Sequence, residues 1–241
     1  MLLKTYLVTG ASQNHFKSLK QFLTSINDIT QECFVWDLGL DPQSITELTT
    51  LFSTVLYRKF DYSQYPDYYN IHISAGEYAW KPAVIKETMD ELLKKDGADS
   101  KILFWCDAGN MLNSTSIALL QDIVNTNKLY SPVASSTLKT WTHPKMLDFF
   151  SINNTHPILN NENRNGAQLG FLITDKEIQE FVTQFDECAR QKECIAPEGS
   201  NRSNHRQDQS LFTILYYRFF QIHPQYTIND MYVCEIHRDI D

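Results

Sequence analysis

The chain has 241 residues, of which 42% are hydrophobic and 21% are charged, and it carries a formal net charge of −8. This length suits one α/β domain with a substantial core. The negative charge argues against non-specific binding of nucleic acid, which requires a dense basic surface. It does not exclude an anionic small ligand, because a few local cations or a metal ion can reverse the field in one pocket.

The cysteines and the N-terminus give no sign of a secreted or membrane protein. The five cysteines are scattered and form no C-x-x-C pair, so neither a zinc site nor a redox motif is indicated. No stretch approaches the roughly 20 apolar residues of a membrane span. The N-terminal sequence MLLKTYLVTG is typical of a strand and a turn rather than of a signal peptide. We therefore expect a soluble, cytoplasmic protein without a membrane span.

Strand-like and helix-like segments alternate along the chain, which favours an α/β fold with a mostly parallel central sheet flanked by helices. In chain order, the expected elements are a strand at 5–8, a helix with Phe16, Leu19, Leu23 and Ile26 on one face, a strand at 33–36, a helix from Pro42, a strand at 54–57, a loop at 61–76, a helix from Pro82, a strand at 102–105, a helix at 114–124, a strand at 169–173, a helix at 178–185 and a helix at 208–220. No repeat or linker divides the chain, so residues 1–241 are predicted to form a single domain.

The first expected strand ends in the turn Thr9-Gly10-Ala11-Ser12. A similar turn opens short-chain dehydrogenases, but dinucleotide binding needs further glycines so that the backbone can approach the pyrophosphate. The residues that follow, QNHF, contain no glycine. We interpret the turn instead as part of a cleft that binds a nucleotide base, since ligands of open α/β sheets bind at the carboxyl ends of strands.

Two charged residues stand at the boundaries of expected elements. Asp107 follows the apolar strand ILFW, and a carboxylate at that place can hold Mg²⁺ or Mn²⁺; the alternative is a turn or N-cap aspartate. Lys81 directly precedes the helix from Pro82, where a cation does not favour the helix dipole. An anion bound jointly by Lys81 and the helix N-terminus would explain this position; the alternative is a solvated lysine beside a core Trp80.

The segment NHRQDQS, residues 204–210, gathers polar side chains immediately before an apolar helix. His205 is a candidate metal ligand or phosphate contact, and Arg206 is a candidate contact for the nucleotide sugar. Asp208 is a candidate general base for an acceptor hydroxyl, and its alternative is a helix N-cap.

The motifs, taken in order, are VTGASQNHF, VWDLGL, RKFDY, EYAWKP, ILFWCDAGN, NGAQLGFLIT and HRQDQSLFTIL. This series resembles the GT-A-fold glycosyltransferases, the nucleotide-diphospho-sugar transferases, over nearly the whole chain. The resemblance implies that Thr9, Ala11 and Asp37 lie near the nucleotide base. It also implies that the segment 166–171, with Gln168, borders the donor sugar and the acceptor.

The same resemblance places Asp107 at the Asp-x-Asp motif that binds a divalent metal, Mn²⁺ or Mg²⁺, together with the diphosphate. The second aspartate of that motif is replaced here by Gly109, so His205 or His237 is expected to complete the metal site. Asp208 matches the acidic residue of a DQ-type motif, which serves as the base in inverting members of the family. The sequence leaves open whether this chain inverts or retains the anomeric configuration.

The sequence therefore predicts a glycosyltransferase that moves a sugar from a UDP- or GDP-sugar to a carbohydrate or another hydroxyl acceptor. A non-catalytic carbohydrate- or nucleotide-binding protein with a degenerate transferase fold is the alternative, and the missing second aspartate favours it. A nucleotidyltransferase normally has a glycine- and lysine-rich phosphate loop after its first strand, and none is present. A short-chain dehydrogenase would need a Tyr-x-x-x-Lys pair, which the chain also lacks.

Overall fold

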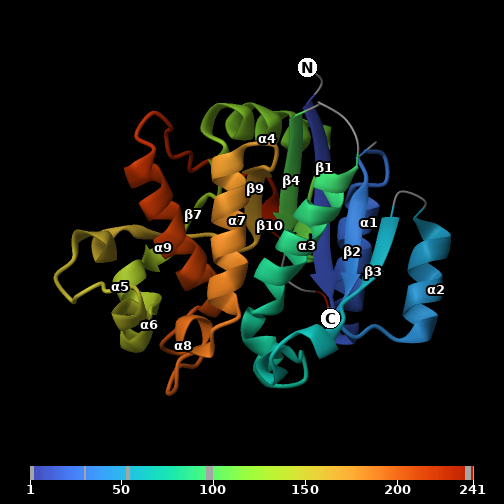
Figure 1. Cartoon of the computed structure of the whole chain (residues 1–241). Coiled ribbons are helices and arrows are strands. Elements are labelled where there is room, and N and C mark those ends of the chain that lie inside the picture. Colours follow the sequence, from blue (N-terminus) through green and yellow to red (C-terminus); the bar gives the residue numbers. More distant parts are fainter. Residues whose placement is uncertain (1–2, 30, 53–54, 96–99, 237–239, 241) are drawn as a thin grey trace.

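The computed structural model describes residues 3–29, 31–52, 55–95, 100–236 and 240 (Figure 1). Its centre is a six-stranded sheet in the order β3-β2-β1-β4-β9-β6. The strands are β1 Leu3–Ala11, β2 Cys33–Asp37, β3 Val55–Lys59, β4 Ser100–Cys106, β6 Leu129–Tyr130 and β9 Gln168–Leu172. Strands β3, β2, β1 and β4 run parallel, whereas β9 runs antiparallel to both of its neighbours. The predicted α/β fold with a mostly parallel sheet is thereby confirmed.

Helices cover both faces of this sheet, because side chains along each strand alternate between them. On one face, α3 Trp80–Lys94, α7 Lys176–Ala189 and α9 Gln207–Ile222 pack against Tyr6 and Leu103 in one core; Figure 1 shows α3 and α7 in front of the sheet. On the other face, α1 Phe16–Ser25, α2 Pro42–Leu51 and α4 Ser114–Asn127 pack against Leu7 and Phe104 in a second core. The sheet is thus buried on both sides, as parallel sheets usually are.

Several short strands and helices lie outside the central sheet and the helices that cover it. Two small antiparallel pairs join β5 Asn110–Met111 to β10 Glu235–Ile236, and β7 Val133–Thr137 to β8 Glu162–Arg164. The short α-helices are α5 Leu138–Trp141, α6 Pro144–Phe149 and α8 Lys192–Ile195. The 3₁₀ turns are η1 Gln13–His15, η2 Tyr62–Gln64, η3 Asp67–Tyr69, η4 Ser74–Tyr78 and η5 Pro157–Asn160.

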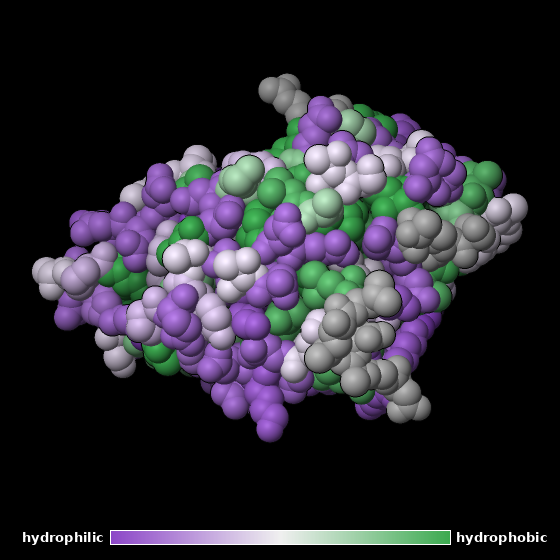
Figure 2. All heavy atoms as spheres, turned by 90° about the horizontal axis from the view of Figure 1, so that it is seen from above, coloured by the Kyte–Doolittle hydropathy of each residue, from purple (hydrophilic) through white to green (hydrophobic). Residues whose placement is uncertain are grey.

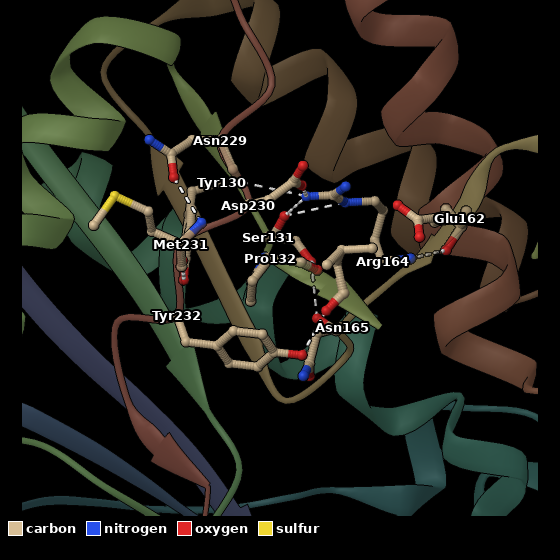
Figure 3. Close-up of polar contacts among 12 residues, drawn as sticks. Tyr130, Ser131, Pro132, Glu162, Arg164, Asn165, Asn229, Asp230, Met231 and Tyr232 are labelled. Atoms are coloured by element: carbon tan, nitrogen blue, oxygen red, sulfur yellow. Dashed lines mark hydrogen bonds and ion pairs between the residues drawn. The ribbon is translucent and has the colours of Figure 1, made fainter. Parts of the chain in front are cut away.

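The C-terminal segment, residues 229–236, is tied back to the sheet by buried polar side chains (Figure 3). The side chain of Arg164 is 1% exposed; its Nε donates to the carbonyl of Ser131 at 3.1 Å, and its guanidinium pairs with Asp230 at 2.7 Å. The hydroxyl of Tyr130 donates to the carbonyl of Met231 at 2.7 Å. Because the guanidinium is withdrawn from water, these partners replace its hydration and fix the segment in place.

The main expected elements occur with small shifts of their ends. Helix α3 begins at Trp80 rather than at Pro82, so Lys81 lies inside its first turn. The third strand begins at Val55, and residue 54 of the expected strand lies outside the described residues. The expected loop 61–76 consists largely of 3₁₀ turns.

Figure 2 views the molecule from the end at which β1 begins, where hydrophilic atoms form most of the outline and hydrophobic atoms show between them. None of the helices in the described part of the chain combines the length and the apolar composition that crossing a bilayer requires.

Two strand glycines provide a matched test of how tightly the sheet packs. A Cβ at Gly170 would lie 2.8 Å from Val124 Cγ2 on α4, whereas one at Gly10 would lie 3.4 Å from Leu38 Cδ1. We predict that Gly170→Ala lowers the free energy of unfolding by about 1–3 kcal/mol through overpacking. Gly10→Ala should change it by less than about 1 kcal/mol. Urea unfolding of both variants checks this, and equal stabilities would show that α4 moves freely away from β9.

Candidate functional site

A cleft of about 770 Å³ opens where the central parallel strands end. Its wall includes the turn after β1, the residues after β2, the start of α3 and the turn after β4. The loop 165–167 and the segment 202–209 close the other side. The cleft therefore lies at the carboxyl ends of the parallel strands, which is where open α/β sheets bind their ligands.

An ion-paired cluster of three side chains forms part of this cleft. The Lys81 Nζ lies 2.8 Å from Asp208 Oδ2 and 3.3 Å from Asp107 Oδ1. It also donates to the carbonyl of Gly166 at 3.1 Å. The start of α3, the end of β4 and the first turn of α9 each contribute one member. The sequence singled out all three residues separately, and the fold brings them together.

The cluster differs in exposure from one member to the next. The side chains of Lys81 and Asp208 are 6% and 9% exposed, whereas that of Asp107 is 43% exposed. The indole Nε1 of Trp105 donates to Asp107 Oδ1 at 2.7 Å, and the Lys81 ammonium lies over the Trp105 ring at 5.4 Å. All three residues line the cleft, but Asp107 exposes its carboxylate to it, whereas Lys81 is almost wholly buried in the wall.

Burial and ion pairing both shift the pKa values of Lys81 and Asp208. Burial raises the pKa of the Asp208 carboxyl above its ordinary value, although the Lys81 ammonium opposes the shift. For Lys81, burial lowers the pKa, but the two carboxylates outweigh it and the net shift is upward. Lys81 is therefore a fixed positive charge at neutral pH.

The alternative roles of the two aspartates can be compared with this geometry. The N-cap of α9 is Arg206, so the N-cap interpretation of Asp208 is wrong. Asp107 does begin a turn, since its carbonyl accepts from the Asn110 N–H at 3.0 Å, and its side chain also serves the Lys81 cluster. Lys81 is buried, so the alternative of a solvated lysine at this position is wrong.

His205 does not face the cleft, which removes the expected metal-ligand role. Its Nε2 lies 2.9 Å from the carbonyl of Ile195, and its Nδ1 accepts from the backbone N–H of His143 at 3.2 Å. Neither ring nitrogen is left for a metal ion in this conformation. Burial lowers the pKa of His205 to about 4, so it is a neutral, structural histidine. His237, the other expected ligand, lies outside the described residues.

Asp37 and Thr9 are buried beneath the cleft and do not line it. Asp37 Oδ1 accepts from the Gly39 N–H at 2.7 Å, and its Oδ2 accepts from the Tyr57 hydroxyl at 2.6 Å. These bonds fix the turn after β2, where Gly39 adopts φ +131°. Thr9 is fully buried, whereas Ala11, the third residue expected near a base, does line the cleft.

Gln168 also faces away from the cleft, contrary to the expected contact with the nucleotide sugar. Its Oε1 accepts from the backbone N–H groups of Val233 at 3.2 Å and Cys234 at 3.0 Å. Gln168 therefore anchors the C-terminal segment beside β9. Gln209 lines the cleft instead, with its Nε2 donating to the carbonyl of Arg164 at 2.8 Å.

Sequence reasoning missed several lining residues because they lie in segments without periodicity. Arg202 lies over the Tyr78 ring at 5.5 Å, and Arg206, which was expected, lies over the Trp141 ring at 4.2 Å. Tyr78 belongs to η4, whose residues all have positive φ, from +46° to +64°. A left-handed backbone costs roughly 1–2 kcal/mol for each residue other than glycine. Strain of this kind clusters at functional sites.

Comparisons with known proteins bear on the fold. A family model described as "Protein of unknown function (DUF1647)" matches residues 3–86. No curated protein sequence matches the chain. Among solved structures, the galactosyltransferase LgtC, in complex with donor and acceptor sugar analogs, has a TM-score of 0.52 at 12% identity, over 87% of this chain and 70% of that one.

Two further structures agree. Mouse xyloside xylosyltransferase 1 has a TM-score of 0.51 at 10% identity, over 95% of this chain and 85% of that one. The glycosyltransferase GlyE of Streptococcus pneumoniae TIGR4 has a TM-score of 0.53 at 10% identity, over 95% of this chain and 46% of that one. The chain has a GT-A fold.

The GT-A fold raises the question of whether the cluster suits a divalent metal. Gly109 stands where the expected Asp-x-Asp motif would have its second aspartate, and the described residues include no group of three or more His, Cys, Asp or Glu side chains placed to hold a metal ion. Asp107 Oδ1 is already engaged by Trp105 and by Lys81. A dication on this carboxylate would lie close to a fixed ammonium, and that repulsion is strong in a partly buried site. These residues do not fit a divalent metal.

The neutral, buried His205 predicts a pH dependence of stability. The unfolded chain binds a proton on this residue below pH 6.5, whereas the folded chain resists it until about pH 4. Stability from this group is therefore present above pH 6.5 and is lost as the pH falls. Between pH 7 and pH 5 we predict a loss of about 2 kcal/mol.

Urea unfolding at the two pH values measures this loss. His205→Asn should flatten the dependence, while His72→Asn, at an exposed position, should retain it. An unchanged slope in His205→Asn would contradict the assignment.

Proposed function

We propose that this chain transfers a sugar from a nucleoside-diphosphate sugar, with UDP or GDP as the nucleotide, to the hydroxyl of a carbohydrate or another acceptor. The observation that carries the proposal is the meeting of Asp107 and Asp208 around Lys81 in the strand-end cleft. The GT-A fold, shared with glycosyltransferases that act on several different sugars, supports it.

The lining of the cleft suits a diphosphate. Its charged side chains are the cations Lys81, Arg202 and Arg206 and the anions Asp107 and Asp208, so the site is locally positive in a chain of net charge −8. A guanidinium that lies over an aromatic ring keeps its N–H edges available for phosphate oxygens. In the proposed complex, Arg202 and Arg206 neutralise the leaving diphosphate. The base lies over the turn that includes Ala11.

Asp208 is the proposed general base. The acceptor oxygen attacks the anomeric carbon, the bond from that carbon to the diphosphate oxygen breaks with its electron pair leaving on the diphosphate, and Asp208 takes the proton. The raised pKa of Asp208 is closer to neutral pH than that of an ordinary aspartate, which favours proton transfer from the acceptor hydroxyl. This scheme describes an inverting transfer; in a retaining transfer Asp208 would act on the donor side.

A non-catalytic sugar- or nucleotide-binding protein is the second candidate. The observation that favours it is Gly109 at the place of the second motif aspartate, together with the pairing of both remaining carboxylates to one lysine. Such a protein would bind the same ligands and release no nucleotide.

Incubation with a panel of UDP- and GDP-sugars and simple glycoside acceptors tests the activity. We predict release of free nucleoside diphosphate with at least one donor. Calorimetry with UDP and GDP accompanies the panel. Binding without turnover would favour the non-catalytic candidate, and no binding of either nucleotide would contradict both the proposed transfer and a nucleotide-binding role.

Replacing Asp208 tests its role. Asp208→Asn should lower kcat by about 10²–10⁴-fold, the usual contribution of a general base, with little change in donor affinity. The matched control is Asp186→Asn, since Asp186 is also buried, has a pKa raised by burial and pairs with Arg190 at 2.8 Å, but lies on α7 outside the cleft lining. The control should keep wild-type turnover. Equal turnover in Asp208→Asn would rule out the base, and NMR of the product anomer would show which stereochemistry applies.

A further inference from the structure

The Lys81 ammonium has three donors and three partners on different segments. They are the carboxylates of Asp107 and Asp208 and the carbonyl of Gly166, at 2.8–3.3 Å. An ammonium has no other hydrogen-bonding capacity. Lys81 thus occupies the point between the two carboxylates, which is where a cation shared by both would have to bind.

The backbone around Lys81 holds it at this point. It lies in the first turn of α3, directly after the left-handed turn η4. The indole Nε1 of Trp80 donates to the carbonyl of Ala75 at 3.1 Å, which ties the helix start to that turn. A side chain at Gly76 would place its Cβ 2.3 Å from the carbonyl oxygen of Tyr69, so the turn also packs closely against the chain before it. The position of Lys81 is therefore set before any ligand arrives.

Pairing with one lysine leaves the two aspartates with a residual charge of −1, which the guanidinium groups of Arg202 and Arg206 exceed. The cleft can thus accept a diphosphate with the charges that the chain itself supplies. Adding a dication at Asp107 would require Lys81 to withdraw, and Lys81 is 6% exposed with no free donor.

We propose that the Lys81 ammonium takes the place of the divalent cation in this cleft, so that nucleoside diphosphate binds without metal. The proposal rests on the proposed function for its ligand. It makes a second claim that does not: Lys81 itself prevents Asp107 and Asp208 from binding a divalent cation, and removing it creates a metal site.

Nucleotide binding by the metal-free wild-type protein is the first test. The protein is treated with EDTA, desalted and titrated calorimetrically with UDP and with GDP, in buffer alone and with MnCl₂ or MgCl₂. We expect the same Kd in all buffers. Binding that appears only with a metal would overturn the proposal while leaving the proposed function intact.

Direct measurement of Mn²⁺ binding is the second test, and it needs no nucleotide. Free Mn²⁺ is followed by electron paramagnetic resonance in titrations of the wild type, Lys81→Ala and the double variant Lys81→Ala, Asp208→Asn. We expect bound Mn²⁺ only in Lys81→Ala, because it alone leaves two facing carboxylates without a cation. Lys86→Ala is the matched control, since Lys86 pairs with Asp90 at 2.5 Å on the same helix but outside the cleft lining.

The outcomes separate the two proposals. Mn²⁺ bound by the wild type as tightly as by Lys81→Ala would overturn the role of Lys81, whatever the nucleotide does. If the wild type binds no nucleotide, the proposed function fails and the Mn²⁺ titrations alone decide about Lys81. If Lys81→Ala does not fold, the wild-type nucleotide titrations decide, because they require no variant.

Discussion

The buried pairing of Lys81 with Asp107 and Asp208 is the constraint on which the site depends. It joins three elements that are distant in sequence, and two of its members, Lys81 and Asp208, are largely withdrawn from water, whereas Asp107 is 43% exposed. Removing one partner of a buried ion pair typically costs about 3–5 kcal/mol, because the remaining charge is left uncompensated. Folding must therefore bring all three residues together, and their arrangement determines the charge and the shape of this part of the cleft.

Other buried polar side chains hold the neighbouring segments of the cleft in place. Asp37 fixes the turn after β2 through the Gly39 N–H, and Arg164 binds the C-terminal segment to the chain just before the loop 165–167. Both residues are buried polar groups with satisfied partners, which rigidify a structure when complete. The strained turn η4 depends on such support, since five consecutive left-handed residues persist only where their neighbours determine them. Rigid walls of this kind suit a ligand that must be held in one orientation.

The sequence predicted the parts of the fold that local patterns encode. The apolar run 102–105 and the helical spacing of Phe16, Leu19 and Leu23 gave the strand β4 and the helix α1, because burial repeats at a fixed period in each. The reversed direction of β9 was not predictable in this way, since an antiparallel neighbour has the same local pattern. His205 was assigned to the site from the polar segment 204–210, and Gln168 from the resemblance of the segment 166–171 to the glycosyltransferases. Their partners, Ile195 and the C-terminal segment, are tertiary contacts that a sequence motif does not contain.

Lys81 shows the same limit at the centre of the site. Its place at a helix start indicated a bound anion, and the structure instead provides two carboxylates from other elements. The most direct measurement is a crystal structure of the wild type grown with UDP or GDP and MnCl₂, with anomalous data at the manganese edge. The account predicts a diphosphate beside Arg202 and Arg206, with the Lys81 ammonium still between the aspartates and no manganese peak there. A manganese peak on Asp107 with Lys81 displaced would contradict it.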